Sequence, residues 1–80
     1  MDDSDVLGRI NELAHEEEGL YEKAGDDGLN DAERARLKTI EVQLDQCWDL
    51  LHQRRARRRA GQNPDDAQVR DPATVEGYVN

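Results

Sequence analysis

The sequence predicts an all-α protein: an antiparallel two-helix hairpin of coiled-coil type, residues 1–61, that dimerises into a four-helix bundle and carries an irregular tail, residues 62–80. Two segments repeat apolar residues at alternating spacings of three and four. A short link rich in glycine and aspartate joins them. Their charges are opposite, since residues 1–33 hold 12 acidic and 2 basic residues, whereas residues 34–60 hold 3 acidic and 8 basic ones.

The first predicted helix spans residues 5–24. Its apolar seam consists of Val6, Ile10, Leu13, Leu20 and Ala24. Asp3 or Ser4 can cap its amino end, and Gly25 can adopt the left-handed conformation that ends a helix. Two internal glycines each cost about 1 kcal/mol relative to alanine. We therefore expect this helix to need a packing partner.

The second predicted helix spans residues 31–60. It begins at an Asn30-x-x-Glu33 capping box and stops at Gly61. Its seam consists of Leu37, Ile40, Leu44, Cys47 and Leu51. The short link makes the helices antiparallel and pairs residues whose numbers sum to roughly 55–57. This register places the acidic amino end beside the arginines of the second helix, and Glu18 and Glu22 beside Lys38 and Arg34.

A second apolar stripe predicts association of two chains. Leu7, Ala14 and Tyr21 recur every seven residues beside the first seam, and Trp48 lies on the matching flank of the second helix. This widens the apolar face beyond what one helix covers, as in a bundle. We therefore predict a homodimer. The predicted hairpin and dimer core is Val6, Leu7, Ile10, Leu13, Leu20, Tyr21, Leu37, Ile40, Leu44, Cys47, Trp48 and Leu51.

The tail contains the breakers Asn63-Pro64 and Asp71-Pro72. We expect it to be partly ordered, with its Val-Glu-Gly-Tyr-Val end either folded back on the hairpin or free to bind a partner.

An arginine cluster ends the second helix and forms the predicted partner-binding set: Arg54, Arg55, Arg57, Arg58 and Arg59. In one interpretation these cations stabilise the carboxyl end of the helix and pair with the acidic amino terminus. In another they bind an acidic protein partner. In a third they bind nucleic-acid phosphates, which a sequence pI of about 4.6 disfavours.

The sequence predicts no catalytic residue, metal site or cofactor. The pairs Glu12-x-x-His15 and Asp49-x-x-His52 have metal-ligand spacing but occupy outer positions of the predicted helices. Cys47 lies on the seam, where a thiol usually packs as a small apolar group. With no basic leader and no long apolar run, we expect a cytoplasmic protein without a membrane segment.

One stretch of the second helix carries a family resemblance. Residues 44–51 read Leu-Asp-Gln-Cys-Trp-Asp-Leu-Leu and are followed by Gln-Arg-Arg-Ala at residues 53–56. Together with the acidic start and the Val-Glu-Gly-Tyr ending, this resembles a family of short actinobacterial proteins known only as a domain of unknown function. The resemblance covers nearly the whole chain. It implies that the Cys-Trp segment and the tail belong to the domain, and it brings no activity, cofactor or functional residue.

These observations favour a non-enzymatic helical hairpin that acts as a protein–protein interaction module. The alternative is a nucleic-acid-associated or transcription-associated accessory protein that uses the same arginines.

Overall fold

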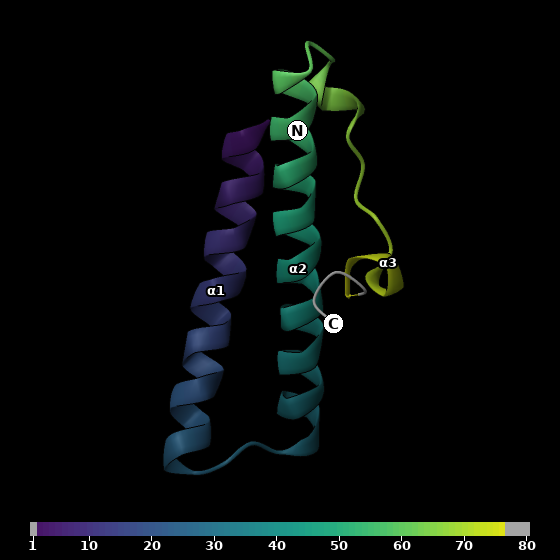
Figure 1. Ribbon diagram of the computed structural model, residues 1–80. Helices are drawn as coiled ribbons and strands as arrows, with labels where there is room; N and C mark the ends of the chain where they lie inside the picture. The colour runs from purple at the N-terminus through teal and green to yellow at the C-terminus, as the bar shows by residue number, and fades with distance from the viewer. Residues whose placement is uncertain (1, 77–80) are drawn as a thin grey trace.

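The computed structural model describes residues 2–76, which form two long helices and a folded-back tail. In chain order the elements are α1 (Asp3–Asp26), α2 (Asp31–Arg59), the 3-10 helix η1 (Pro64–Asp66) and α3 (Pro72–Glu76). Helices α1 and α2 lie side by side and antiparallel, joined by a short turn (Figure 1). Residues 2–76 contain no strand. The predicted all-α hairpin is therefore confirmed.

The start and end of α1 correct the predicted boundaries. Its cap is Asp2 rather than Asp3 or Ser4: the Asp5 amide donates to Asp2 Oδ1 at 2.9 Å, and the Asp2 amide donates to Asp5 Oδ2 at 3.0 Å. This reciprocal pair satisfies two amides at once, so the helix begins earlier than predicted. At the other end the helix continues through Gly25 to Asp26, and Gly28 takes the left-handed conformation at φ +76°.

Both ends of α2 follow the predicted signals. The Glu33 amide donates to Asn30 Oδ1 at 2.8 Å, and the Asn30 amide donates to Glu33 Oε1 at 3.0 Å. At the carboxyl end Gly61 has φ +73°, and the Gln62 amide donates to the Arg57 carbonyl at 2.8 Å. This is a Schellman motif, which needs a left-handed residue and explains the glycine.

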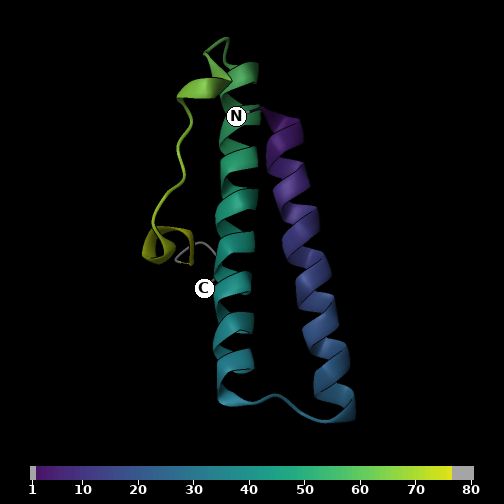
Figure 2. The ribbon, with the colours of Figure 1, turned by 180° about the vertical axis from the view of Figure 1, so that it is seen from behind.

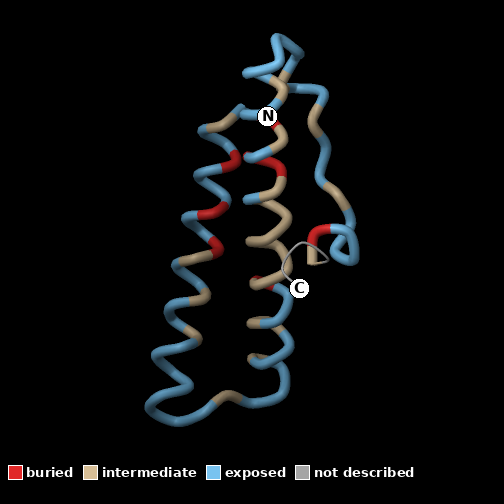
Figure 3. Tube along the Cα trace, in the orientation of Figure 1, coloured by how far each residue is buried: buried red, intermediate tan, exposed pale blue. Residues whose placement is uncertain are grey.

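The hairpin core lies between α1 and α2. Five of its buried members, Val6, Ile10, Leu13, Ile40 and Leu51, were predicted, and a sixth, Leu50, was not. Figure 3 shows the buried positions of α1 gathered toward its amino-terminal end, whereas the half near the turn is more exposed. Other predicted seam residues, Leu20, Leu37, Leu44 and Cys47, are half-buried. The core is therefore strongest where the acidic amino end meets the arginine-rich end of α2.

Three predicted core residues lie outside the core of the hairpin. Leu7 is 38% exposed, Tyr21 is 53% exposed and Trp48 is 42% exposed. They occupy the flank of the seam, where the neighbouring helix does not reach over them. All three belong to the second stripe predicted beside the seam rather than to the seam itself, so the dimer core that includes them stays a prediction.

Ion pairs across the hairpin test the predicted register. Asp3 pairs with Arg54 at 2.7 Å, and Lys23 pairs with Glu33, both in agreement with it. The predicted pairing of Glu18 and Glu22 with Lys38 and Arg34 is not what forms: the cross-helix pair in this region joins Glu16 to Arg36 at 2.5 Å. Arg34 instead pairs with Asp31, one turn earlier on its own helix.

The tail packs on the side of α2 opposite α1 (Figure 2). Leu50, which the seam did not include, is only 5% exposed and belongs to the same apolar cluster as Val6, Ile10 and Leu51. Ala67 packs against this cluster, and Val75 of α3 is 3% exposed. Residues 62–76 thus fold back on the hairpin. The predicted Val-Glu-Gly-Tyr-Val end spans residues 75–79: its first residue, Val75, is buried as the folded-back alternative requires, and residues 77–79 lie outside the described residues.

Candidate functional site

Arg54 joins three segments of the fold. Its side chain is 6% exposed, and its Nε donates to Asp3 Oδ1 of α1 at 2.7 Å. Its Nη1 donates to Asp65 Oδ1 at 3.0 Å and to the Pro64 carbonyl at 3.3 Å, both in η1. Arg54 therefore belongs to the structure of the hairpin rather than to the predicted partner-binding surface.

Arg58 shares the same acidic partner. Its Nη2 donates to both carboxylate oxygens of Asp3, at 2.9 and 2.8 Å. The guanidinium groups of Arg54 and Arg58 hold the pKa of Asp3 below its ordinary value of 3.8. The sequence contained a signal that separates Arg54 and Arg58 from the other arginines, because these two continue the three-and-four spacing of the seam beyond Leu51.

The other three arginines are available to a partner. Within residues 2–76, the side chains of Arg55, Arg57 and Arg59 make no hydrogen bond or ion pair. Arg55 and Arg59 are exposed and line an open hollow together with Arg58. Of the five arginines predicted to bind a partner, Arg54 and Arg58 are thus engaged within the chain, whereas the side chains of the other three are not.

A stripe on α2 carries the exposed tryptophan. We call Glu41, Trp48 and Arg55 the Trp48 stripe, because their seven-residue spacing places them on one side of the helix. The Trp48 ring lies 6.4 Å from that of His52, centroid to centroid. The Tyr21 hydroxyl of α1 donates to Glu41 Oε1 at 2.9 Å and so ties α1 to the edge of the stripe.

Polar groups on another side of α2 hold the tail. Arg70 makes a two-point ion pair with Asp49, in which Nε donates to Oδ2 at 2.8 Å and Nη2 donates to Oδ1. Gln53 Nε2 donates to the Gln68 carbonyl at 2.8 Å, and Gln46 Nε2 donates to the Arg70 carbonyl at 3.1 Å. Arg70 holds the pKa of Asp49 below its ordinary value.

Sequence reasoning missed this tail-holding surface. A signal existed, since residues 46, 49 and 53 recur at helical spacing beside Leu50. Polar residues at such positions are usually solvated, so the pattern did not by itself predict a docked tail.

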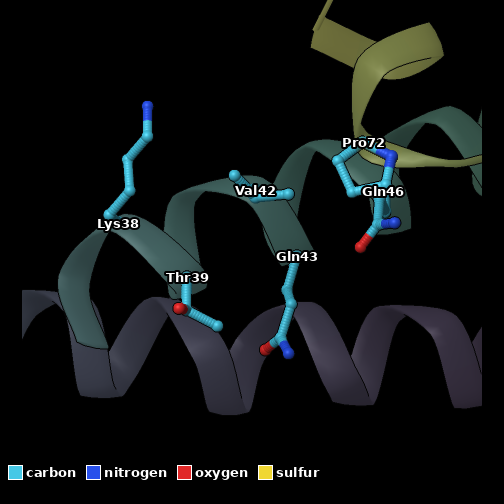
Figure 4. A pocket seen from close by; sticks show the side chains of 6 residues that line it. All are labelled: Lys38, Thr39, Val42, Gln43, Gln46 and Pro72. Carbon is cyan, nitrogen blue, oxygen red and sulfur yellow. The ribbon is translucent and has the colours of Figure 1, made fainter. Parts of the chain in front are cut away.

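A shallow hollow lies where α3 meets α2. It is lined by Lys38, Thr39, Val42, Gln43, Gln46 and Pro72 (Figure 4). In Figure 4 the Gln43 side chain points toward α1, away from Val42 and Pro72. Its Oε1 atom is buried without a hydrogen-bond partner.

The remaining candidate groups are dispersed. Burial raises the pKa of the half-buried Cys47 thiol, which keeps it protonated at neutral pH. Asp49 of one predicted acid–histidine pair is engaged by Arg70. Within residues 2–76 there is no group of three or more His, Cys, Asp or Glu side chains placed to hold a metal ion.

None of the described helices combines the length and apolar character needed to cross a bilayer.

Comparison with known proteins finds relatives of similar length. A protein of Mycobacterium bovis and two of Mycobacterium tuberculosis, from strains CDC 1551 and H37Rv, are each 46% identical over 78 residues, and all three are named as uncharacterized. The alignments cover 96% of this chain and 90% of each relative. No solved structure matches the chain.

The family match extends along the hairpin and the tail together. Residues 2–80 match a family described as "Protein of unknown function (DUF2630)". The mycobacterial relatives agree with the resemblance seen in the Cys-Trp segment, which pointed to actinobacterial proteins. The chain therefore belongs to the DUF2630 family, a protein family of unknown function.

Proposed function

We propose that this chain is a non-enzymatic protein–protein interaction module and that it forms a homodimer. The observation that carries the proposal is the exposure of Trp48, 42% accessible on the flank of α2. The α1 helix and the tail cover other sides of α2, where Leu50 is buried with Ala67 against its cluster and Val75 of the tail is buried as well. A large aromatic side chain left half-exposed beside buried ones is typical of a protein interface.

The neighbourhood of Trp48 supports this interpretation. Leu7 and Tyr21 of α1 are also exposed, and they share one heptad position with Ala14. Each of these residues directly follows a seam position of its helix. In an antiparallel pair such positions face one another, so this flank of α1 and the Trp48 flank of α2 lie on the same side of the hairpin. The exposed apolar side chains therefore lie along one side of the hairpin.

Sedimentation equilibrium tests the dimer. We expect a reversible dimer over about 1–100 µM, because dimerisation follows mass action. Trp48→Ala should shift the equilibrium toward monomer. Val69→Ala is the matched control, because Val69 is 60% exposed on the tail, away from this face. A wild-type chain that stays monomeric throughout this range would rule out the homodimer.

A second candidate rests on the three unpaired arginines at the end of α2. Arg55, Arg57 and Arg59 give this end a local positive charge on a chain of net charge −8. We propose that an acidic segment of a partner protein binds there. A nucleic acid is less favoured, because its phosphates extend beyond this end and meet the acidic remainder of the surface.

A pair of binding measurements separates these partners. A peptide of eight glutamates and a single-stranded oligonucleotide of similar charge are each titrated at about 150 mM salt. Acidic-protein binding predicts peptide binding that is lost when Arg55, Arg57 and Arg59 are all changed to Gln. Oligonucleotide binding lost in the same variant would favour the nucleic-acid accessory role. If neither probe binds, the arginine end is no docking site.

A further inference from the structure

The Trp48 stripe carries opposite charges at equal distances from its centre. Glu41 precedes Trp48 by seven residues and Arg55 follows it by seven. At 1.5 Å per residue, each charge lies about 10.5 Å from the tryptophan along the helix. The stripe therefore presents a carboxylate, an indole ring and a guanidinium in a straight row.

This row is complementary to itself when one copy is reversed. A two-fold axis through Trp48 and perpendicular to α2 brings Trp48 against the partner subunit's Trp48. The same operation brings Glu41 against the partner subunit's Arg55, and the reciprocal pair forms on the other side. A parallel pairing in the same register would instead place carboxylate beside carboxylate and guanidinium beside guanidinium. The charges thus select the antiparallel arrangement.

The groups of the stripe are free to make these contacts. The Arg55 side chain is exposed and makes no hydrogen bond or ion pair in the described part of the chain. Glu41 accepts from the Tyr21 hydroxyl through Oε1 only, so its second carboxylate oxygen remains available. The tail does not obstruct the stripe, because its polar contacts on α2 are made at other heptad positions, by Gln46, Asp49, Gln53 and Arg54.

We propose that two copies of this chain pack α2 against α2 in antiparallel orientation, centred on Trp48, with Glu41 of each copy paired to Arg55 of the other. A second copy of the chain would therefore cover the exposed apolar face, in this antiparallel arrangement. It rests on the homodimer proposed above. The indole pair supplies the buried centre of the interface, and the two ion pairs set its direction.

Charge reversal tests the pairing. Glu41→Arg and Arg55→Glu each turn both intersubunit ion pairs into repulsive ones, and each should weaken dimerisation by about tenfold at low salt. The double variant restores opposite charges in the reversed order. Its dimerisation constant should return to within about threefold of wild type.

Three matched controls accompany these variants. Arg59→Glu makes the same charge change one turn beyond the stripe, and Glu12→Arg makes the opposite change on an outer position of α1. Tyr21→Phe removes the hydroxyl bound to Glu41 without altering any charge. All three should dimerise like wild type. Circular dichroism of each variant checks that it remains helical.

The outcomes separate this arrangement from the dimer itself. Rescue in the double variant supports the pairing of Glu41 with Arg55. A dimer that is unaffected by either reversal, or weakened by both without rescue, overturns the arrangement while the homodimer stands. A wild-type chain that is monomeric overturns both proposals.

Discussion

Leu50→Ala tests whether Leu50 of α2 is buried in the core together with the tail. Leu50 is 5% exposed and packs in the cluster that includes Val6, Ile10 and Leu51, with Ala67 of the tail against it. The substitution removes three carbon atoms. At about 0.8 kcal/mol for each, the lost transfer free energy is about 2.4 kcal/mol, and the cavity raises the total to about 3 kcal/mol.

The effect is large for a chain of this size. A domain of 80 residues has a free energy of unfolding of about 4–12 kcal/mol. Leu7→Ala is the matched control, because it makes the same chemical change at a side chain that is 38% exposed. It should cost about 1 kcal/mol, since less of that side chain is removed from water.

Urea unfolding followed by far-ultraviolet circular dichroism measures both variants. All samples are compared at one protein concentration, because dimerisation makes apparent stability depend on concentration. The dependence of the free energy on urea should keep its slope, since the folded surface changes little. If Leu50→Ala destabilises no more than Leu7→Ala, then the tail does not bury Leu50 in solution and the reasoning fails.

Three further predictions follow from the ion pairs. Arg54→Gln should lower the melting temperature clearly and Arg59→Gln should leave it unchanged, because only Arg54 is buried among acidic partners; equal thermal melts would contradict this. Arg70→Gln should release the tail at a cost of about 1 kcal/mol, since Arg70 itself is more than a third exposed and screened by solvent. Faster amide exchange over residues 67–76, with α1 unaffected, would show it, and unchanged exchange would refute it. The pKa values of Asp3 and Asp49 lie below the ordinary 3.8, so their stabilisation is complete above that pH and is lost as the pH falls through the lower folded values. Thermal melts should therefore change little from pH 7 to about 5 and fall in temperature below about pH 4, and Asp49→Asn should flatten that fall.

The two long helices and their antiparallel pairing could be predicted because their signals are local. Leu51 and Ile40 lie on seams that repeat within one helix, and the Asn30 and Glu33 capping box involves residues three apart. The cap of α1 was placed at Asp3 or Ser4, one or two residues too late, because the acidic start offers several candidates and only the helical phase decides between them.

The flanks of the seam could not be predicted in the same way. Leu50 and Trp48 are both large apolar residues beside the seam of α2, on opposite flanks. The tail covers the flank of Leu50 and leaves that of Trp48 open. A heptad pattern shows that both positions are near the core, but it does not show where a distant segment will lie.

The arginines illustrate the same division. Five similar side chains end α2, and sequence alone gave no complete reason to separate them. In the fold, Arg54 forms ion pairs with Asp3 and Asp65, and Arg58 forms one with Asp3. Arg55 stays exposed. That assignment depends on η1 returning to the end of α2, which is a contact between segments rather than a property of either one.

The sequence by itself therefore determined the two helices, their antiparallel pairing and the buried half of the seam, since periodicity and capping act over a few residues. Only the tertiary structure decided which flank of α2 the tail covers, which arginines are structural, and which apolar side chains remain exposed. The physical reason is that burial on a flank depends on segments far apart in the chain, whose packing no local pattern encodes.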